Sequence, residues 1–292
     1  MSAVVARLAG VPASVRIASV NVNGIRAAVR KGMIEWLAGA DVDVMALQEV
    51  RANADELAAA LPGWHIVGNE AEAKGRAGVA IAARIAPADV RTALGDGGTD
   101  AAGRWIEADY EFGGERLTVV SAYVHTGEAG TPRQAAKYAF LDAMEERMPR
   151  LQAHAPLSLI MGDLNVGHTQ RDIRNWKGNV KNAGFLPRER AYFDRFVGQA
   201  GMPVNTADGA TGTGLGWVDV GRQAHGDVDG PYTWWSMRGR AFDNDTGWRI
   251  DYHLATPDLA ARASGYSVVR APSWDTRWSD HAPVVADYRV GA

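Results

Sequence analysis

Seven short runs of apolar and β-branched residues, each bounded by turn residues, constrain this chain most. They begin at Val15, Val42, Gly78, Arg104, Leu117, Leu157 and Trp248. Runs of this composition and length are typical of strands in the interior of a sheet. Helical periodicity lies between or after them, over residues 25–37, 52–60, 132–150 and 188–199. The alternation predicts an α/β domain with two sheets inside and helices outside.

One domain is expected over residues 15–290, after a loose lead-in at residues 1–14. No stretch of it has linker composition, and the glycine-rich stretch 209–216 is expected to be a flexible loop. The chain has 292 residues, of which 47% are hydrophobic, so it can bury a substantial core. No apolar run approaches the roughly 20 residues of a membrane-spanning helix, so no membrane partner is expected. We further expect a cytoplasmic monomer, associated with the nucleoid if the source is bacterial.

The complete absence of cysteine limits the chemistry. Disulfides, thiolate metal sites and cysteine nucleophiles are all excluded, and any metal must bind to oxygen or imidazole ligands. The absence also fits a reducing compartment. A serine hydrolase with a Gly-x-Ser-x-Gly turn is excluded as well, because the chain has no such motif.

Basic charge is concentrated in one segment, residues 166–195. The net charge of the whole chain is -3, which argues against a surface that attracts nucleic acid everywhere. Within the segment, three acidic residues stand against seven basic ones, which are Arg171, Arg174, Lys177, Lys181, Arg188, Arg190 and Arg195. Such a segment is either a solvated loop and helix face or a surface for phosphate groups.

Polar residues stand where several of the predicted strands end, and Asp280-His281 precedes the last apolar run. They are Asn21, Glu49, Tyr123, Asp163, Asn165, Asp251, Asp280 and His281. Active sites of α/β folds are built at strand ends, so these side chains are expected to meet at one edge.

The chemistry of these residue types indicates phosphoester hydrolysis. The oxygen ligands of Glu49, Asp163, Asn165 and Asp280 suit Mg²⁺, with Mn²⁺ as a substitute. A histidine held by a carboxylate, here His281 with Asp251, has a fixed tautomer and can orient or activate a water. Each motif alone has an ordinary explanation: Gly-Asp-x-Asn is common in turns, and Ser-Asp-His can cap a helix. Their occurrence together, each after its own strand, favours a site.

Eight motifs carry a family resemblance: SVNVNGIRA, ALQEV, SAYV, IMGDLNVGHT, DIRNWKGNVKNAGFLPRER, YTWW, GWRIDY and WSDHAPV. Together they resemble the exonuclease III and abasic-site endonuclease family, within the endonuclease/exonuclease/phosphatase superfamily, over residues 15–288. The resemblance implies a four-layered α/β sandwich, in which two mixed β-sheets pack face to face with helices on both outer sides. It also implies a Mg²⁺-dependent DNA-repair phosphodiesterase. Such an enzyme acts on duplex DNA at abasic sites or 3′ ends, as endonuclease, 3′–5′ exonuclease or 3′-phosphatase, and leaves 3′-OH ends.

The same resemblance implies roles for individual residues. Asp163 resembles the group that activates the attacking water or protonates the leaving group, oriented by Asn165, while His281 contacts the scissile phosphate. The implied catalytic residues are Tyr123, Asp163, Asn165, Asp251 and His281. The implied metal site comprises Asn21, Glu49, Asp163, Asn165, Asp280 and His281. The implied DNA contacts are Asn23, Thr126, Arg174, Lys177, Lys181, Trp234, Arg238 and Trp248.

The chain departs from the family after Tyr123. Many members continue with Pro-Asn-Gly or Pro-Gln-Gly, whereas here Val124, His125, Thr126 and Gly127 follow. The basic, DNA-inserting residue that some members carry next is also replaced, by Glu128-Ala129. These departures leave open which activity on DNA dominates.

Three alternatives remain at this point. Trp234 and Trp248 resemble bulky residues that wall a pocket for an extrahelical abasic sugar, with Arg238 as its basic neighbour, but tryptophans are also common in cores. The chain resembles, more distantly, superfamily phosphatases and phospholipases that act on inositol phosphates or sphingomyelin; the basic segment 172–190 counts against these. A catalytically inactive DNA-binding module is the third alternative, although every expected catalytic position holds a competent residue.

Overall fold

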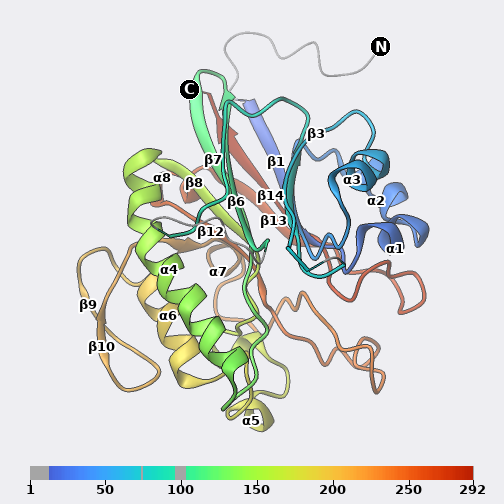
Figure 1. The fold of residues 1–292 in the computed structure, drawn as a ribbon. Coiled ribbons are helices and arrows are strands. Elements are labelled where there is room, and N and C mark those ends of the chain that lie inside the picture. The colour runs from blue at the N-terminus through green and yellow to red at the C-terminus, as the bar shows by residue number, and fades with distance from the viewer. Residues whose placement is uncertain (1–12, 74, 96–102, 292) are drawn as a thin grey trace.

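Two six-stranded mixed sheets pack face to face at the centre of the molecule (Figure 1). The structure is a computed structural model and describes residues 13–73, 75–95 and 103–291. The fold is the four-layered α/β sandwich that the sequence predicts, with helices on both outer sides. Within the described residues, no helix is long and apolar enough to cross a bilayer.

The first sheet has the strand order β13-β14-β1-β2-β4-β3. Only β1 and β2 pair in parallel among these neighbours; the other pairs are antiparallel. Its strands are β1 (Ala13–Asn21), β2 (Val44–Gln48), β3 (His65–Asn69), β4 (Val79–Ala83), β13 (Ala263–Val268) and β14 (Val284–Val290).

The second sheet has the order β11-β12-β8-β7-β6-β5, with β7 and β8 as its parallel pair. Its strands are β5 (Asp89–Arg91), β6 (Trp105–Phe112), β7 (Glu115–Tyr123), β8 (Leu157–Asp163), β11 (Val218–Asp219) and β12 (Asp251–Ala255). Each sheet thus has a central parallel pair, whose carboxyl ends lie together.

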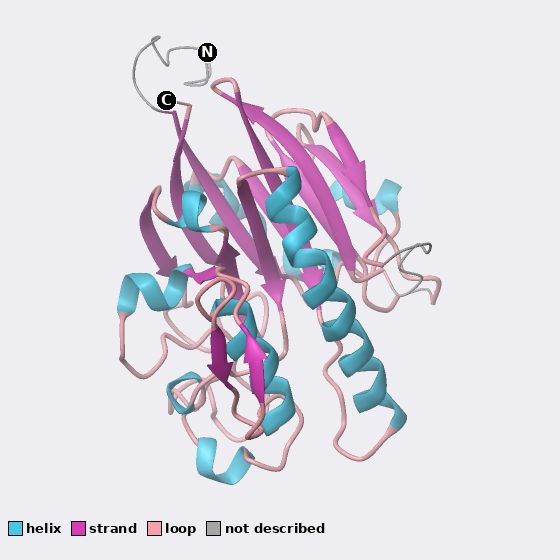
Figure 2. Cartoon of the chain, turned by 90° about the vertical axis from the view of Figure 1, so that its left-hand side faces the viewer, coloured by secondary structure: helices cyan, strands magenta, loops and turns pink. Residues whose placement is uncertain are grey.

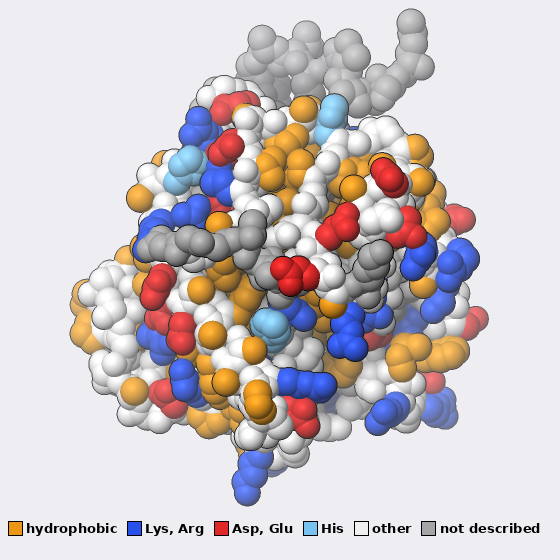
Figure 3. Space-filling model, in the orientation of Figure 1, with side chains coloured by type: hydrophobic (Ala, Val, Ile, Leu, Met, Phe, Trp, Pro, Cys, Tyr) orange, Lys and Arg blue, Asp and Glu red, His pale blue; other side chains and the backbone are white. Residues whose placement is uncertain are grey.

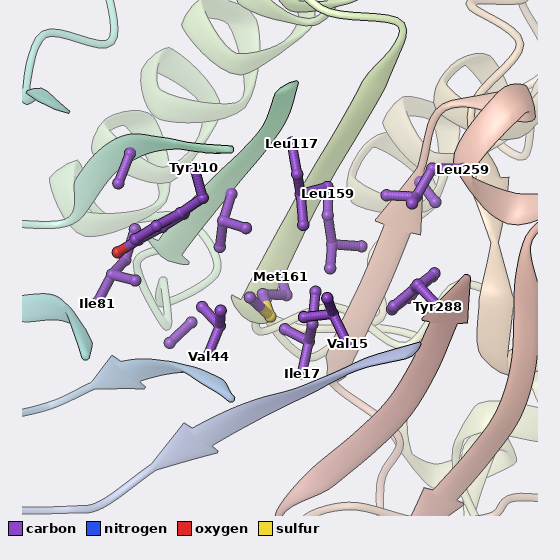
Figure 4. Packing of buried hydrophobic residues seen from close by; sticks show 14 of the residues in the cluster. Val15, Ile17, Val44, Ile81, Tyr110, Leu117, Leu159, Met161, Leu259 and Tyr288 are labelled. Carbon is purple, nitrogen blue, oxygen red and sulfur yellow. The ribbon is translucent and has the colours of Figure 1, made fainter. Parts of the chain in front are cut away.

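Side chains alternate between the two faces of each sheet, and this alternation builds the layers. Ile17 and Val44 point to the space between the sheets, where they meet Leu117, Leu159 and Met161 (Figure 4). Their neighbours Ala18 and Met45 point to the other face, where the helices lie. Burial of a Val, Leu or Ile side chain contributes about 1.5–3 kcal/mol, so the inter-sheet layer and the two helix-facing layers all stabilise the fold.

Helices cover the outer faces. On the first sheet lie α1 (Ile25–Arg30), α2 (Met33–Ala40) and α3 (Ala54–Ala60). On the second lie α4 (Pro132–His154) and α6 (Pro187–Val197), and Figure 2 shows α4 as the long helix lying over the sheet in roughly the direction of its strands. The first turn of α4 forms where expected, because the Thr131 side chain accepts a hydrogen bond from the Arg133 N–H and Pro132 occupies the first position. The shorter elements are η2 (Gln170–Asp172), α5 (Trp176–Asn179), α7 (Val220–His225) and α8 (Pro257–Ala260).

The structure corrects three expectations about local structure. The helix expected at 25–37 is two helices, because Gly32 adopts a left-handed conformation (φ 111°) between them. The stretch 209–216 is not only a loop: β9 (Pro203–Asn205) and β10 (Thr211–Thr213) pair there as a hairpin. The strand expected from Trp248 begins at Asp251. Of the expected lead-in, residues 1–12 lie outside the described part, and β1 already includes residues 13 and 14.

Candidate active site

One edge of the two sheets collects the polar residues that end the strands. The parallel pairs bring Asn21 beside Gln48 and Tyr123 beside Asp163. β12 runs antiparallel to β8 and starts at this edge, so Asp251 lies opposite Asp163. Gly162 makes the close pairing of β7 and β8 possible: its φ is 145°, and a Cβ atom there would lie 1.9 Å from the Ala122 carbonyl oxygen.

Three side chains form a group that fits a metal ion. The ligand atoms of Glu49, Asp163 and His281 all lie within 4.8 Å of one another. The amide nitrogen of Asn21 donates to Glu49 Oε1 and to Asp163 Oδ2, both at 3.0 Å, and so fixes the spacing of the two carboxylates. Carboxylate oxygens are the ligands that Mg²⁺ prefers. The donor set therefore suits a hard divalent cation.

The surroundings of Asp163 disfavour its ionised form. Its carboxylate is buried, and burial raises its pKa well above the usual value. The nearby carboxylates of Asp251 and Glu49 raise the pKa further, while His281 opposes them. Since the carboxylates need positive charge to ionise together, the electrostatics also favour a bound cation.

His281 is held by Asp251. Its Nδ1 lies 2.8 Å from Asp251 Oδ2, and its Nε2 lies 3.7 Å from Asp163 Oδ2. Burial alone would lower the pKa of His281, but the carboxylates of Asp251 and Asp163 raise it well above its usual value. The two carboxylates therefore favour the protonated ring, which can donate from Nε2.

Glu49 and Asn165, both at this edge, adopt strained backbone conformations. Glu49 and Asn165 have φ values of 50° and 51°, in the left-handed region that side chains other than glycine rarely adopt. The Asn165 N–H donates to Asp163 Oδ1 at 3.0 Å, and its side-chain amide donates to the Val124 carbonyl at 2.9 Å. Asn165 thus connects the ends of β7 and β8 and orients Asp163. Strain of this kind is often found at functional sites.

Asp280 lies beside this group, and each of its carboxylate oxygens accepts a hydrogen bond from another residue. Its Oδ1 accepts from Asn23 Nδ2 at 2.8 Å, and its Oδ2 accepts from Trp234 Nε1 at 3.1 Å. In this arrangement Asp280 positions Asn23 and Trp234. Its predicted place among the metal ligands stays a prediction.

Tyr123 is the last residue of β7, and its side chain is buried. The guanidinium of Arg104 lies 4.4 Å from the centre of its ring, and Arg104 Nη1 donates to the Tyr123 carbonyl at 3.2 Å. Burial raises the pKa of Tyr123, and the charges of Glu49 and Asp163 raise it further. Tyr123 therefore keeps its proton and can donate a hydrogen bond to an anion.

A cavity of about 380 Å³ opens over these residues. Trp234 and Trp248 form one wall, with ring centres 6.1 Å apart and planes at 87°. Both are half-buried and line the cavity, so they are not core tryptophans. Gly184 allows Trp248 to lie close, because a Cβ atom there would be 2.8 Å from the indole. The remaining lining residues are Glu49, Thr126, Asp163, Asn165, Asn179, Asn182, Ala183, Ile250, Asp280 and His281.

The predicted basic DNA contacts lie outside this cavity. Arg174, Lys177 and Lys181 are exposed on the segment that supplies Asn179 and Asn182 to the wall. Arg238 is exposed and is not among the lining residues.

Several charges of the basic segment serve the fold instead. Arg195 pairs with Glu145, Arg190 donates to the His168 carbonyl, and the guanidinium of Arg188 lies 4.1 Å from the ring centre of Tyr138. The segment is therefore less available to an anion than its charge count indicates.

The sequence reading missed a buried ion pair behind the site. Lys137 Nζ lies 2.8 Å from Glu189 Oε1 and donates to the Asn165 and Thr126 carbonyls at 2.7 and 3.2 Å. Glu189 Oε2 accepts from the Gly184 and Leu186 N–H groups. Both side chains are fully buried. The pair thus joins three parts of the cavity wall, and nothing in the local sequence signals it, because the partners are far apart in the chain. Ser279, which donates to the Asn21 carbonyl across 258 positions, was missed for the same reason. Arg51, only two positions from its partner Glu49, was missed as well.

Replacing Lys137 with methionine is expected to lower the free energy of unfolding by about 3–5 kcal/mol, because Glu189 is then a buried charge without its partner. Urea denaturation measures the loss. Arg133→Met, one turn earlier on α4 and exposed, is the matched control, with a change within about 0.5 kcal/mol. Adding Glu189→Gln to Lys137→Met should recover part of the loss. Additive losses in the double variant would contradict the pairing.

Known proteins similar to this chain include nucleases, both among its relatives in sequence and among solved structures. The model of the "Endonuclease/Exonuclease/phosphatase family" matches residues 18–281. The chain is 31% identical to an exodeoxyribonuclease of Bacillus subtilis, over 92% of this chain and 97% of the relative. It is 30% identical to the DNA repair nuclease APEX1 of Danio rerio, over 94% and 82%. Among solved structures, the 3′ phosphatase NExo from Neisseria bound to a product DNA hairpin superimposes with a TM-score of 0.78 at 29% identity, covering 94% of this chain and 99% of that one. An AP endonuclease from Archaeoglobus fulgidus gives 0.77 at 26% identity, covering 94% and 100%.

Proposed function

Because this chain belongs to the endonuclease/exonuclease/phosphatase family, we propose that it is a Mg²⁺-dependent phosphodiesterase that cleaves duplex DNA at abasic sites or 3′ ends and leaves a 3′ hydroxyl. The chain is a metal-dependent DNA-repair nuclease, as its exodeoxyribonuclease and AP endonuclease relatives indicate. The observation that carries the finer proposal is the meeting of Asn21, Glu49, Asp163, Asp251 and His281 at one sheet edge, beneath a cavity walled by two tryptophans.

In this mechanism each side chain has a task that its contacts allow. Protonated His281, fixed through Nδ1 by Asp251, donates from Nε2 to a phosphoryl oxygen. Tyr123 donates to the same phosphate, and Asp163, oriented by the Asn165 N–H, accepts the proton of the attacking water. Glu49 and Asp163, with Asn21 beside them, would hold the ion, whereas protonated His281 has no free ring nitrogen to bind it. Bound Mg²⁺ polarises the phosphoryl oxygen and stabilises the leaving alkoxide.

Glu49→Gln is expected to raise the Mg²⁺ concentration needed for half-maximal activity by about tenfold or more, because a neutral amide is a weaker ligand than a carboxylate. A Mg²⁺ titration of DNA cleavage measures the shift. The control is Glu111→Gln, since Glu111 is exposed and pairs with Arg116 at the far end of β6. An unchanged titration would remove Glu49 from the metal site.

We assign Arg174, Lys177 and Lys181 to the phosphates of the duplex. Replacing all three with alanine is expected to lower the slope of log Kd against log salt by about 2.7, since each phosphate contact in B-DNA contributes about 0.9. Fluorescence anisotropy with a labelled duplex in EDTA measures the slope. Arg116→Ala, which removes an exposed cation near the start of β7, is the control. A slope equal to that of the unchanged protein would show that the segment does not contact DNA.

The balance of activities is tested with two labelled duplexes in Mg²⁺, one with an internal abasic analogue and one intact with a recessed 3′ end. Incision at the abasic position supports a lesion pocket formed by Trp234 and Trp248. Trimming without incision means that the loop at His125 and Thr126 favours 3′-end processing. Hydrolysis of inositol phosphates or sphingomyelin, with no cleavage of either DNA, would overturn the proposal.

We also propose that the protein is a cytoplasmic monomer of one domain, acting on nucleoid DNA if its source is bacterial. The absence of cysteine supports a reducing compartment. Light scattering after size-exclusion chromatography tests the monomer, and a dimer mass would contradict it.

A further inference from the structure

A second hollow, of about 290 Å³, lies next to the candidate active site. It shares Asp280 and Asn23 with the site's hydrogen-bond network, in which Asn23 donates to Asp280. Its other side is formed by Met237, Trp274 and Arg277, which come from the two loops at the lower right of Figure 1. The hollow therefore adjoins the active-site cavity, with Asp280 in the lining of both.

Two large apolar side chains of this hollow are exposed to solvent. Trp274 is 48% exposed and Met237 is 56% exposed. Trp278, only four residues further along, shows the usual behaviour of an indole: it packs against Trp36, with ring centres 5.6 Å apart. Exposing an indole and a thioether together is unfavourable in water, so a contiguous patch of this kind indicates a binding surface.

Arg277 adds a cation to the hollow, which Asp275 and Asp280 also line. Among the described residues, no carboxylate oxygen is paired with its guanidinium within 4.0 Å. Its Nη2 contacts Met237 Sδ at 2.8 Å, its Nη1 donates to the Trp235 carbonyl at 3.4 Å, and its buried Nε has no hydrogen-bond partner. The guanidinium carbon lies 5.5 Å from the centre of the Trp274 ring. The cation is thus held beside the exposed indole and available to an anion.

Lys31 also lines the hollow and supplies a second cation. In Figure 3, Lys and Arg side chains, with a few Asp and Glu, lie around hydrophobic ones on the lower right of the visible face. An aromatic surface between cations matches the chemistry of one nucleotide: the base has an apolar face that stacks on an aromatic ring, and the phosphate binds the cations. Only an unpaired, unstacked base can offer such a face, because duplex bases cover one another.

We propose that this hollow binds one unpaired nucleotide of the DNA substrate close to the scissile phosphate, with its base on Trp274 and Met237 and its phosphate on Arg277 and Lys31. The inference rests on the proposed function and deepens it. It gives the enzyme a means of holding a frayed or single-stranded nucleotide at a 3′ end, a contact separate from the cavity of Trp234 and Trp248.

The test uses full-length protein in EDTA and duplexes with a short single-stranded 3′ extension, in which 2-aminopurine occupies one position at a time. Stacking on an indole quenches 2-aminopurine, so quenching is expected at one or two adjacent positions. Trp274→Ala should abolish that quenching and weaken binding at least about fivefold, the lower end of base–aromatic stacking. Trp274→Phe should keep most of the affinity, since a phenyl ring also stacks.

The matched control is Met202→Ala, which removes an exposed methionine next to β9, whereas Met237→Ala should weaken binding. Thermal unfolding checks that every variant is folded. Unchanged binding and quenching in folded Trp274→Ala, or equal quenching at every position, would overturn the inference.

Mg²⁺-dependent cleavage of the same duplexes by the unchanged protein separates this result from the proposed function. Cleavage together with unaltered binding by Trp274→Ala overturns the nucleotide site alone. Neither cleavage nor binding of DNA by the unchanged protein overturns the proposed function, and the nucleotide site with it.

Discussion

Replacing Asp163 with asparagine is expected to lower kcat for DNA cleavage by about 10²–10⁴-fold, the range of a positioned acid–base group. Asparagine has the same shape and can still accept a hydrogen bond from Asn21, which donates to Asp163 Oδ2 at 3.0 Å. It cannot take a proton from water at neutral pH. Single-turnover cleavage at saturating Mg²⁺ measures the chemical step.

The same substitution should raise the thermal stability of the metal-free protein at neutral pH. Burial raises the pKa of Asp163, and a carboxyl whose folded pKa is raised stabilises the fold below its unfolded pKa and loses that contribution as the pH rises through the folded value. An uncharged asparagine avoids the loss. Asp227→Asn, at an exposed position, is the control for both readouts. A kcat within threefold of the unchanged protein would remove Asp163 from the chemistry, and a lower Tm would contradict the electrostatic argument.

Most central strands could be predicted from the sequence, because each has an unbroken apolar run. β4 (Val79–Ala83) and β8 (Leu157–Asp163) are buried at every position, and their largely apolar sequences predict this burial directly. β3 (His65–Asn69) and β13 (Ala263–Val268) were not predicted. Both lie at sheet edges and are only partly buried, so their composition resembles that of loops.

The membership of the site could be predicted better than its hydrogen bonds. A polar residue at the end of a buried strand is visible in the sequence, and Asn21, Asp163 and Asp251 were identified in this way. Which atoms meet depends on contacts between distant segments: Asn23 donates to Asp280 across 257 positions of the chain. The charge of the basic segment was overestimated for the same reason, since Glu145, the partner of Arg195, lies on another helix.

His281→Ala is expected to lower kcat by about 10²-fold or more, because the substitution removes the group that donates to the phosphate. In the structure His281 lies 2.8 Å from Asp251 and 3.7 Å from Asp163. His154→Ala is the matched control, since His154 also lies next to an aspartate, Asp109, but on the outer face of the second sheet. Single-turnover rates measure both. A rate near that of the unchanged protein would remove His281 from the mechanism.

Substitution of Asp251 tests whether Asp251 and His281 act as one unit. Asp251→Asn removes the charge that fixes His281 and should lower kcat by about tenfold or more, although less than His281→Ala. If Asp251 acts only through the imidazole, it has nothing left to orient once His281 is alanine. The double variant should then be no slower than His281→Ala alone. Multiplied losses would mean that Asp251 has a second task, and its Oδ1, which is buried without a hydrogen-bond partner, is the atom that would carry it.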